Sequence, residues 1–128
     1  MKRGEKVYSF VKYEKDMESG YRRGLEEIKR PEEIGGLFRE YVFKLLKKIK
    51  PDLPEDMKEG IVFKPDDGEP FDLSDELRKA IGDELMEKSD LPAIIRRFAL
   101  SAQHRYKKLK SDDERTDLFR LGDGARPH

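Results

Sequence analysis

Apolar residues recur at intervals of three and four along most of this chain, and this spacing constrains the fold more than any other feature. Residues three and four apart share one face of a helix, so each series predicts an amphipathic helix with its apolar side inward. The clearest series lies in the segment 91–110 and comprises Leu91, Ile94, Ile95, Phe98, Ala102, Tyr106 and Leu109. We therefore predict a mainly α domain in which the helix 91–110 buries this face.

Two further series predict helices over residues 7–28 and 31–50. Their connection is short, so we expect an antiparallel helical hairpin. Gly20 and Gly24 lie within the first helix and are expected either to permit a close helix crossing or to mark a break. The segment 6–13 also fits a strand, because it is rich in β-branched and aromatic residues. In the second helix the lysines near residue 50 suit the negative end of the helix dipole.

Residues 65–68, with the sequence Pro-Asp-Asp-Gly, have the composition of a turn. They predict a small β-hairpin or an extended loop near 61–73. Ser74 is expected to cap a helix over 75–88, and Ser89 or Asp90 to cap the helix 91–110.

Ser111 is followed three residues later by Glu114, a capping-box pattern that predicts a separate fifth helix. The expected fold is thus a compact helical domain of about five helices over residues 1–122, with the hairpin or loop near 61–73. Residues 123–128 are expected to form a flexible C-terminal tail.

The composition supports a folded, soluble chain. Leucine, isoleucine, valine and phenylalanine number 31 of 128 residues, which is enough for a core although 44% of the residues are charged. No apolar stretch is long enough to span a membrane, and no apolar segment follows the basic N-terminus as in a signal peptide. The chain has no cysteine, so we exclude disulfides and thiolate chemistry and expect a cytoplasmic protein. The absence of asparagine beside many lysines and glutamates is typical of thermophilic proteins.

Charge is segregated along the chain. Residues 1–50 carry a net charge of +5, residues 51–90 a net charge of −9, and residues 91–128 a net charge of +4. The total is zero, so the average conceals an acidic middle between two basic ends. Blocks of opposite sign attract each other, either within the fold or across an interface.

The helix 91–110 contains no acidic residue and is the first candidate site for nucleic acid or another anion. Arg97, Ser101, His104 and Lys108 follow helical spacing and form one ridge. The alternative is a solvated helix face, or one neutralised by the acidic block. The candidate residues are Arg96, Arg97, His104, Arg105, Lys107, Lys108 and Lys110.

The second candidate is an acidic docking loop that comprises Asp66, Asp67, Glu69 and Asp72. Carboxylates in such density suit Ca²⁺ or Mg²⁺, but the residue order departs from the EF-hand pattern, so we expect no metal site. The alternatives are ordinary turn residues on a surface, or a loop that docks on the basic helix of a neighbouring subunit.

Catalytic motifs are absent from the sequence: it has no phosphate-binding glycine loop, and neither His104 nor His128 belongs to a metal-ligand pair. We therefore predict no catalytic residue and no cofactor. The expected function is a small, non-catalytic interaction module whose partner is another protein or a second copy of the chain. The alternatives are binding of nucleic acid or an anion through the helix 91–110, or an enzyme of unknown type.

Overall fold

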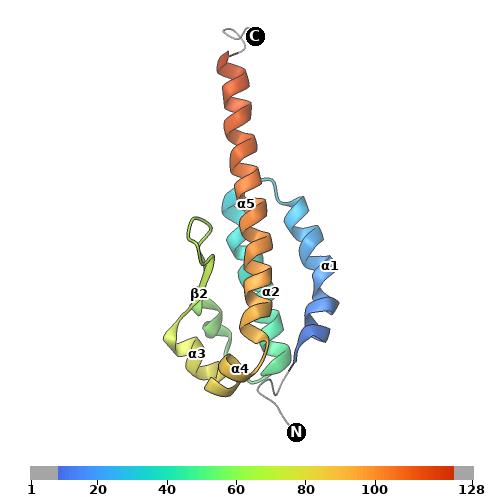
Figure 1. Cartoon of the computed structure of the whole chain (residues 1–128), viewed down its shortest axis with the longest axis vertical. Helices are drawn as coiled ribbons and strands as arrows, with labels where there is room; N and C mark the ends of the chain where they lie inside the picture. The colour runs from blue at the N-terminus through green and yellow to red at the C-terminus, as the bar shows by residue number, and fades with distance from the viewer. Residues whose placement is uncertain (1–8, 123–128) are drawn as a thin grey trace.

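A computed structural model describes the backbone of residues 9–122 and the side chains of residues 9–111. Three long helices, α1 (Val11–Glu27), α2 (Ile34–Ile49) and α5 (Leu91–Gly122), lie side by side, and each contacts the other two (Figure 1). As predicted, α1 and α2 form an antiparallel hairpin, and α5 runs parallel to α1. The predicted mainly α fold with a small hairpin is confirmed.

Shorter elements join the long helices. A 3₁₀ helix, η1 (Pro31–Glu33), lies between α1 and α2. Between α2 and α5 lie a 3₁₀ helix, two strands and two α-helices, namely η2 (Glu55–Gly60), β1 (Ile61–Phe63), β2 (Phe71–Leu73), α3 (Asp75–Ile81) and α4 (Asp83–Lys88). The strands pair antiparallel, with Ile61 opposite Leu73 and Phe63 opposite Phe71. Two strands alone are marginal, and this hairpin is stabilised by packing on the helices.

The apolar side of α5 faces inward, as its spacing predicts. Ile94 and Ile95 are fully buried, Phe98 is nearly so, and Tyr106 is half-buried against the same core. Phe38 of α2 lies at the centre of this core, with its ring centroid 5.5 Å from that of Phe63 and 6.4 Å from that of Phe71. The core therefore joins the helices to the hairpin.

The glycines of α1 permit a close crossing and do not break the helix. α1 is continuous, and a Cβ atom built on Gly24 would lie 3.0 Å from a methyl carbon of Leu37 on α2. The strand alternative for 6–13 is wrong for Val11–Tyr13, which are helical. Residues 6–8 and the predicted tail 123–128 lie outside the described residues.

The predicted single helix over 75–88 is wrong, because Gly82 divides it into α3 and α4. Gly82 has φ 101° and ψ 145°, a backbone conformation that residues other than glycine rarely adopt. Ser74 caps α3 as expected, since its Oγ accepts a hydrogen bond from Leu77 N at 3.1 Å. Periodicity alone misses the break, since Leu77, Ile81 and Leu85 keep helical spacing across it.

Replacing Gly82 with alanine is expected to lower the free energy of unfolding by about 1–2 kcal/mol. The loss arises from backbone strain, because nothing lies within 4 Å of a Cβ atom built at this position. Urea unfolding followed by circular dichroism measures it. Gly36 also has open space around its Cβ position and lies in α2, so Gly36→Ala should leave stability unchanged or raise it. Equal effects of the two substitutions would contradict this explanation.

The predicted separate fifth helix is also wrong. α5 runs without interruption through Ser111, because neither glycine nor proline occurs between Pro92 and Gly122 to end it. Ser89 caps its start, since Ser89 Oγ accepts a hydrogen bond from Leu91 N at 3.0 Å. The C-terminal turns of α5 extend beyond the other elements (Figure 1).

Candidate functional site

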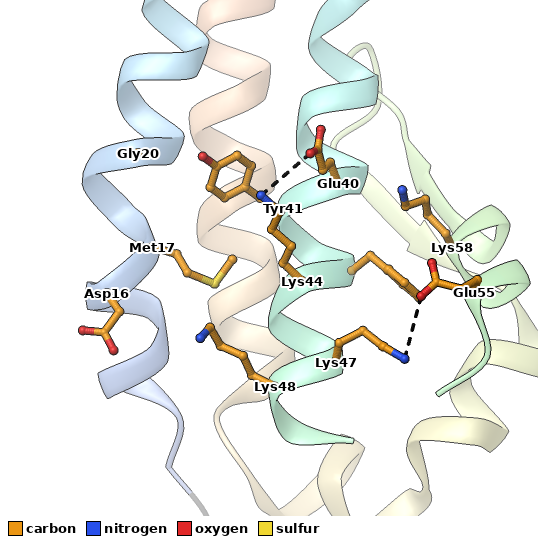
Figure 2. Close-up of a pocket in the computed structure, with 11 residues that line it drawn as sticks. Asp16, Met17, Gly20, Glu40, Tyr41, Lys44, Lys47, Lys48, Glu55 and Lys58 are labelled. Carbon is orange, nitrogen blue, oxygen red and sulfur yellow. Dashed lines mark ion pairs between the residues drawn. The ribbon is translucent and has the colours of Figure 1, made fainter. Parts of the chain in front are cut away.

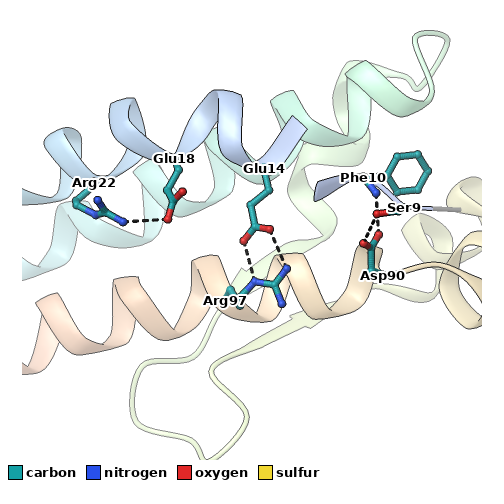
Figure 3. Close-up of polar contacts among 7 residues, drawn as sticks. All are labelled: Ser9, Phe10, Glu14, Glu18, Arg22, Asp90 and Arg97. Atoms are coloured by element: carbon teal, nitrogen blue, oxygen red, sulfur yellow. Dashed lines mark hydrogen bonds and ion pairs between the residues drawn. The ribbon is translucent and has the colours of Figure 1, made fainter. Parts of the chain in front are cut away.

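The arginines of the predicted basic helix 91–110 contribute first to the fold itself. Arg97 forms a bidentate ion pair with Glu14 of α1, in which Nε and Nη2 each donate to a carboxylate oxygen at 2.8 Å (Figure 3). This hydrogen-bonded pair raises the pKa of Arg97 above its ordinary value. The Glu14 side chain is only 13% exposed, so the pair is shielded more than an ordinary surface pair.

Arg105 binds the C-terminal end of α1. Its Nε donates to the carbonyl oxygen of Leu25 at 2.9 Å, and its Nη2 donates to those of Glu26 and Ile28 at 3.1 and 3.0 Å. The last carbonyl groups of a helix have no partner within the helix and carry the negative end of its dipole. One guanidinium therefore caps α1 from a helix about eighty residues away in sequence.

The other parts of α1 are also attached to α5. Asp90 accepts hydrogen bonds from Phe10 N and Ser9 Oγ, both at 2.9 Å, just before the first turn of α1 (Figure 3). The Tyr21 hydroxyl donates to the carbonyl oxygen of Phe98 at 2.7 Å, and burial raises the pKa of Tyr21 well above its ordinary value. Polar contacts therefore hold α1 on α5 along its whole length.

The acidic docking loop packs against α5 of its own chain. Arg96 pairs with Glu69 at 2.7 Å, and the Gln103 amide donates to the carbonyl oxygens of Pro65 and Asp67 at 3.0 and 3.1 Å. The carboxylates of the loop remain exposed. The loop thus neutralises one end of the basic helix within the monomer, and docking between subunits remains a prediction.

Two carboxylates of this loop also have local partners. Asp72 accepts a hydrogen bond from Arg78 at 3.1 Å, which lowers its pKa together with a bond from its neighbour Leu73 N. Lys64 lies 3.4 Å from Asp67. Among the described residues, no group of three or more carboxylate or histidine side chains is placed to hold a metal ion.

His104, Lys107, Lys108 and Lys110 are exposed and have no ion pair with any side chain among residues 9–111. They differ in where they lie. His104 and Lys108 line a pocket of about 310 Å³ between α1 and α5, whereas Lys107 and Lys110 are not part of its lining. The structure therefore divides the predicted anion-binding residues into three arginines that contribute to the fold and four exposed side chains without an ion-pair partner among residues 9–111.

A second site, which the sequence analysis did not identify, is a groove of about 750 Å³ between α1, α2 and η2. Met17, Tyr41 and Phe43 provide its apolar part. Figure 2 shows Met17 and Tyr41 in the space between α1 and α2, with Lys48 beside them. We call this the lysine groove, and its cationic lining residues are Lys44, Lys47, Lys48 and Lys58.

Two of these lysines have carboxylate partners within the groove. Lys44 lies 3.8 Å from Glu40, and Lys47 lies 3.8 Å from Glu55 while it donates to two carbonyl oxygens of the loop that follows α2 (Figure 2).

The other two lysines lie over aromatic rings. Lys48 Nζ is 5.8 Å from the centroid of Tyr13, and Lys58 Nζ is 5.6 Å from that of Phe43. Neither forms an ion pair with a carboxylate among the described residues. The groove thus presents two cations that have no ion-pair partner among the described residues.

The sequence held a signal for this groove. Lys47 and Lys48 lie three and four residues after Lys44, so both are its neighbours on the surface of α2. Cations near a helix C-terminus also suit the helix dipole, so this spacing alone does not distinguish a binding site from a favourable helix end. Lys58 carries no such signal, because it reaches the groove from η2 through the fold of the intervening loop.

Comparisons with protein-family models, with curated proteins and with solved structures found no match for this chain. Within the described part of the chain, no helix is both long and apolar enough to cross a membrane. Any functional conclusion therefore has to come from the chemistry of the sites themselves.

Proposed function

We propose that this protein is a small, non-catalytic binding module that holds an acidic segment of a partner protein in the lysine groove. The observation that carries this proposal is the convergence of four lysines on an apolar floor between α1, α2 and η2. Grooves between helices are common docking sites for amphipathic segments, with apolar anchors inside and charges at the rim.

The charge of the groove favours an acidic occupant. Once Lys44 and Lys47 are matched with Glu40 and Glu55, Lys48 and Lys58 remain against the single carboxylate of Asp16. Their ammonium groups rest over aromatic rings, which limits the freedom that each side chain loses on binding. A carboxylate on the partner would pair with each of them.

The floor of the groove favours an occupant with at least one apolar side chain. Met17 is flexible and polarizable, so it can adapt to different apolar partners. Tyr41 stands beside it with its ring half-buried. Apolar anchors in such a floor supply most of the affinity, whereas rim charges mainly supply specificity and association rate.

The composition of the chain and the residues that line the groove support a cytoplasmic location and a function without catalysis. A chain without cysteine needs no oxidising compartment, and we place this activity in the cytoplasm. The groove gathers lysines and carboxylates but no histidine, and His104 is exposed on α5 away from it. We therefore propose binding and no reaction.

Selection of short random peptides on the intact protein tests the proposal. We expect the enriched peptides to combine aspartate or glutamate with an apolar residue, and to bind at least about tenfold more weakly to the Lys48→Glu/Lys58→Glu variant. The matched control is Lys79→Glu/Lys88→Glu, which changes net charge equally at exposed positions outside the groove. Fluorescence anisotropy measures the affinities.

Two outcomes would overturn the proposal. The first is a set of peptides without acidic enrichment, or with equal loss of binding to both double variants. The second is a chain that dimerises in sedimentation experiments and loses its dimer only in the groove variant, since a second copy would then be the occupant.

A further inference from the structure

The pocket between α1 and α5 lies on a different side of α1 from the lysine groove. Its volume is about 310 Å³. Its lining residues are Arg22, Ser101, His104, Arg105 and Lys108, together with Leu25 and Glu26. It thus gathers three of the predicted anion-binding residues and adds Arg22 from α1.

The charges in this pocket are poorly compensated. Arg105 donates only to carbonyl oxygens, which are neutral, so its charge is not cancelled by a carboxylate. Lys108 has no ion pair with another described side chain. Arg22 pairs with Glu18 one turn away, but both side chains are well exposed, so the pair is weak and exchangeable. Among the described residues that line the pocket, Glu26 is the only one with a carboxylate.

The donors of the pocket are also preorganised. Three hydrogen bonds fix the Arg105 guanidinium, and its Nη1 donates to no described residue. Ser101, His104 and Lys108 are three and four residues apart on α5, so they lie on one face of a rigid helix. A tetrahedral dianion accepts several hydrogen bonds at once, and donors held in place in advance bind it with less loss of entropy.

We infer that this pocket binds the phosphate group of a small phosphorylated molecule. The volume admits a phosphate with a modest organic group, at the lower end of the usual range for ligand sites. A free small molecule is favoured over nucleic acid, because Arg96 and Arg97 are paired with Glu69 and Glu14 and interrupt the cationic track along residues 91–111 of α5. This inference is independent of the function proposed for the lysine groove.

Titration of the intact, isotope-labelled protein with inorganic phosphate and with AMP tests the inference. We expect saturable shifts of backbone amide signals from residues 101–108 and 22–26. The Arg22→Glu/Lys108→Glu variant should bind AMP at least about tenfold more weakly. The matched control, Arg23→Glu/Lys107→Glu, carries the same net charge on neighbouring exposed positions of the same helices and should bind as the wild type.

Three outcomes would overturn the inference. They are the absence of saturable binding of AMP and phosphate, an equal loss in the two double variants, and tighter binding of a single-stranded oligonucleotide that lacks a terminal phosphate. The last result would assign the face to nucleic acid. Circular dichroism of each variant identifies loss of folding, and in that case His104→Ala, at an exposed position, provides the same comparison.

Discussion

Replacing Phe38 with alanine is expected to lower the free energy of unfolding by about 3–5 kcal/mol. Phe38 is 0% exposed, and its ring packs on Phe63 and Phe71 of the hairpin. The substitution would leave a cavity at the junction of α2 with both strands, and a two-stranded sheet has little stability of its own. We therefore expect the hairpin to loosen first, with the helices retained until global unfolding.

Urea denaturation measures the first effect, and hydrogen exchange of the hairpin amides measures the second. Leu100→Ala is the matched control, because Leu100 is also large and apolar but is 41% exposed on α5. It should cost less than about 1 kcal/mol. A Phe38→Ala variant no less stable than Leu100→Ala would show that the described core does not hold the hairpin.

Replacing Arg105 with alanine is expected to lower the free energy of unfolding by about 2–3 kcal/mol. The change removes three hydrogen bonds to the C-terminal carbonyl oxygens of α1 and the charge that complements its dipole. The last turn of α1 would then fray, since the carbonyl groups of Glu26 and Ile28 would have only water as partner, and that of Leu25 would keep only its bond from Ile28 N. Thermal unfolding and amide exchange in residues 22–28 measure this loss.

The controls separate the geometry of Arg105 from its charge. Arg105→Lys keeps the charge but loses the planar fork, so we expect it to restore less than half of the lost stability. Arg23→Ala removes an arginine that is exposed on α1 and should change stability by about 0.5 kcal/mol or less. Full rescue by Arg105→Lys would show that charge alone acts there.

The buried face and the expected end of α5 both depend on residues that are close together in the sequence. The apolar series from Leu91 to Leu109 lies on one face of the helix, and this is the face that is buried. The inward side of α5 could therefore be predicted without knowing which elements pack against it. The capping-box pattern at Ser111 is equally local, but it only favours a helix start and does not require one. With no residue to end α5 before it, the helix continues.

The break between α3 and α4 at Gly82, in contrast, does not follow from the sequence pattern. A glycine in a helical pattern is compatible with a helix, and the spacing of apolar residues remains correct on both sides. The positive φ of Gly82 is a feature of the path that the chain takes from the hairpin to α5, and the sequence pattern does not specify this path.

The candidate binding residues on α5 also combine features that the sequence predicts with features that depend on tertiary contacts. That Arg97, His104, Arg105 and Lys108 lie near one another on one helix follows from their spacing. Which donors remain for a ligand depends on α1: its Glu14 pairs with Arg97, whereas its terminal carbonyl groups leave Nη1 of Arg105 without a partner among the described residues.

Helical faces were predictable because they depend on residues three and four positions apart, and this spacing is visible in the sequence. The contacts that join α1 to α5 link residues about eighty positions apart, and many different pairings of these charges fit the same sequence pattern. Packing of the three long helices selects one of these pairings. For this reason only the tertiary structure distinguishes the arginines that hold the fold from the lysines that have no ion-pair partner among the described residues.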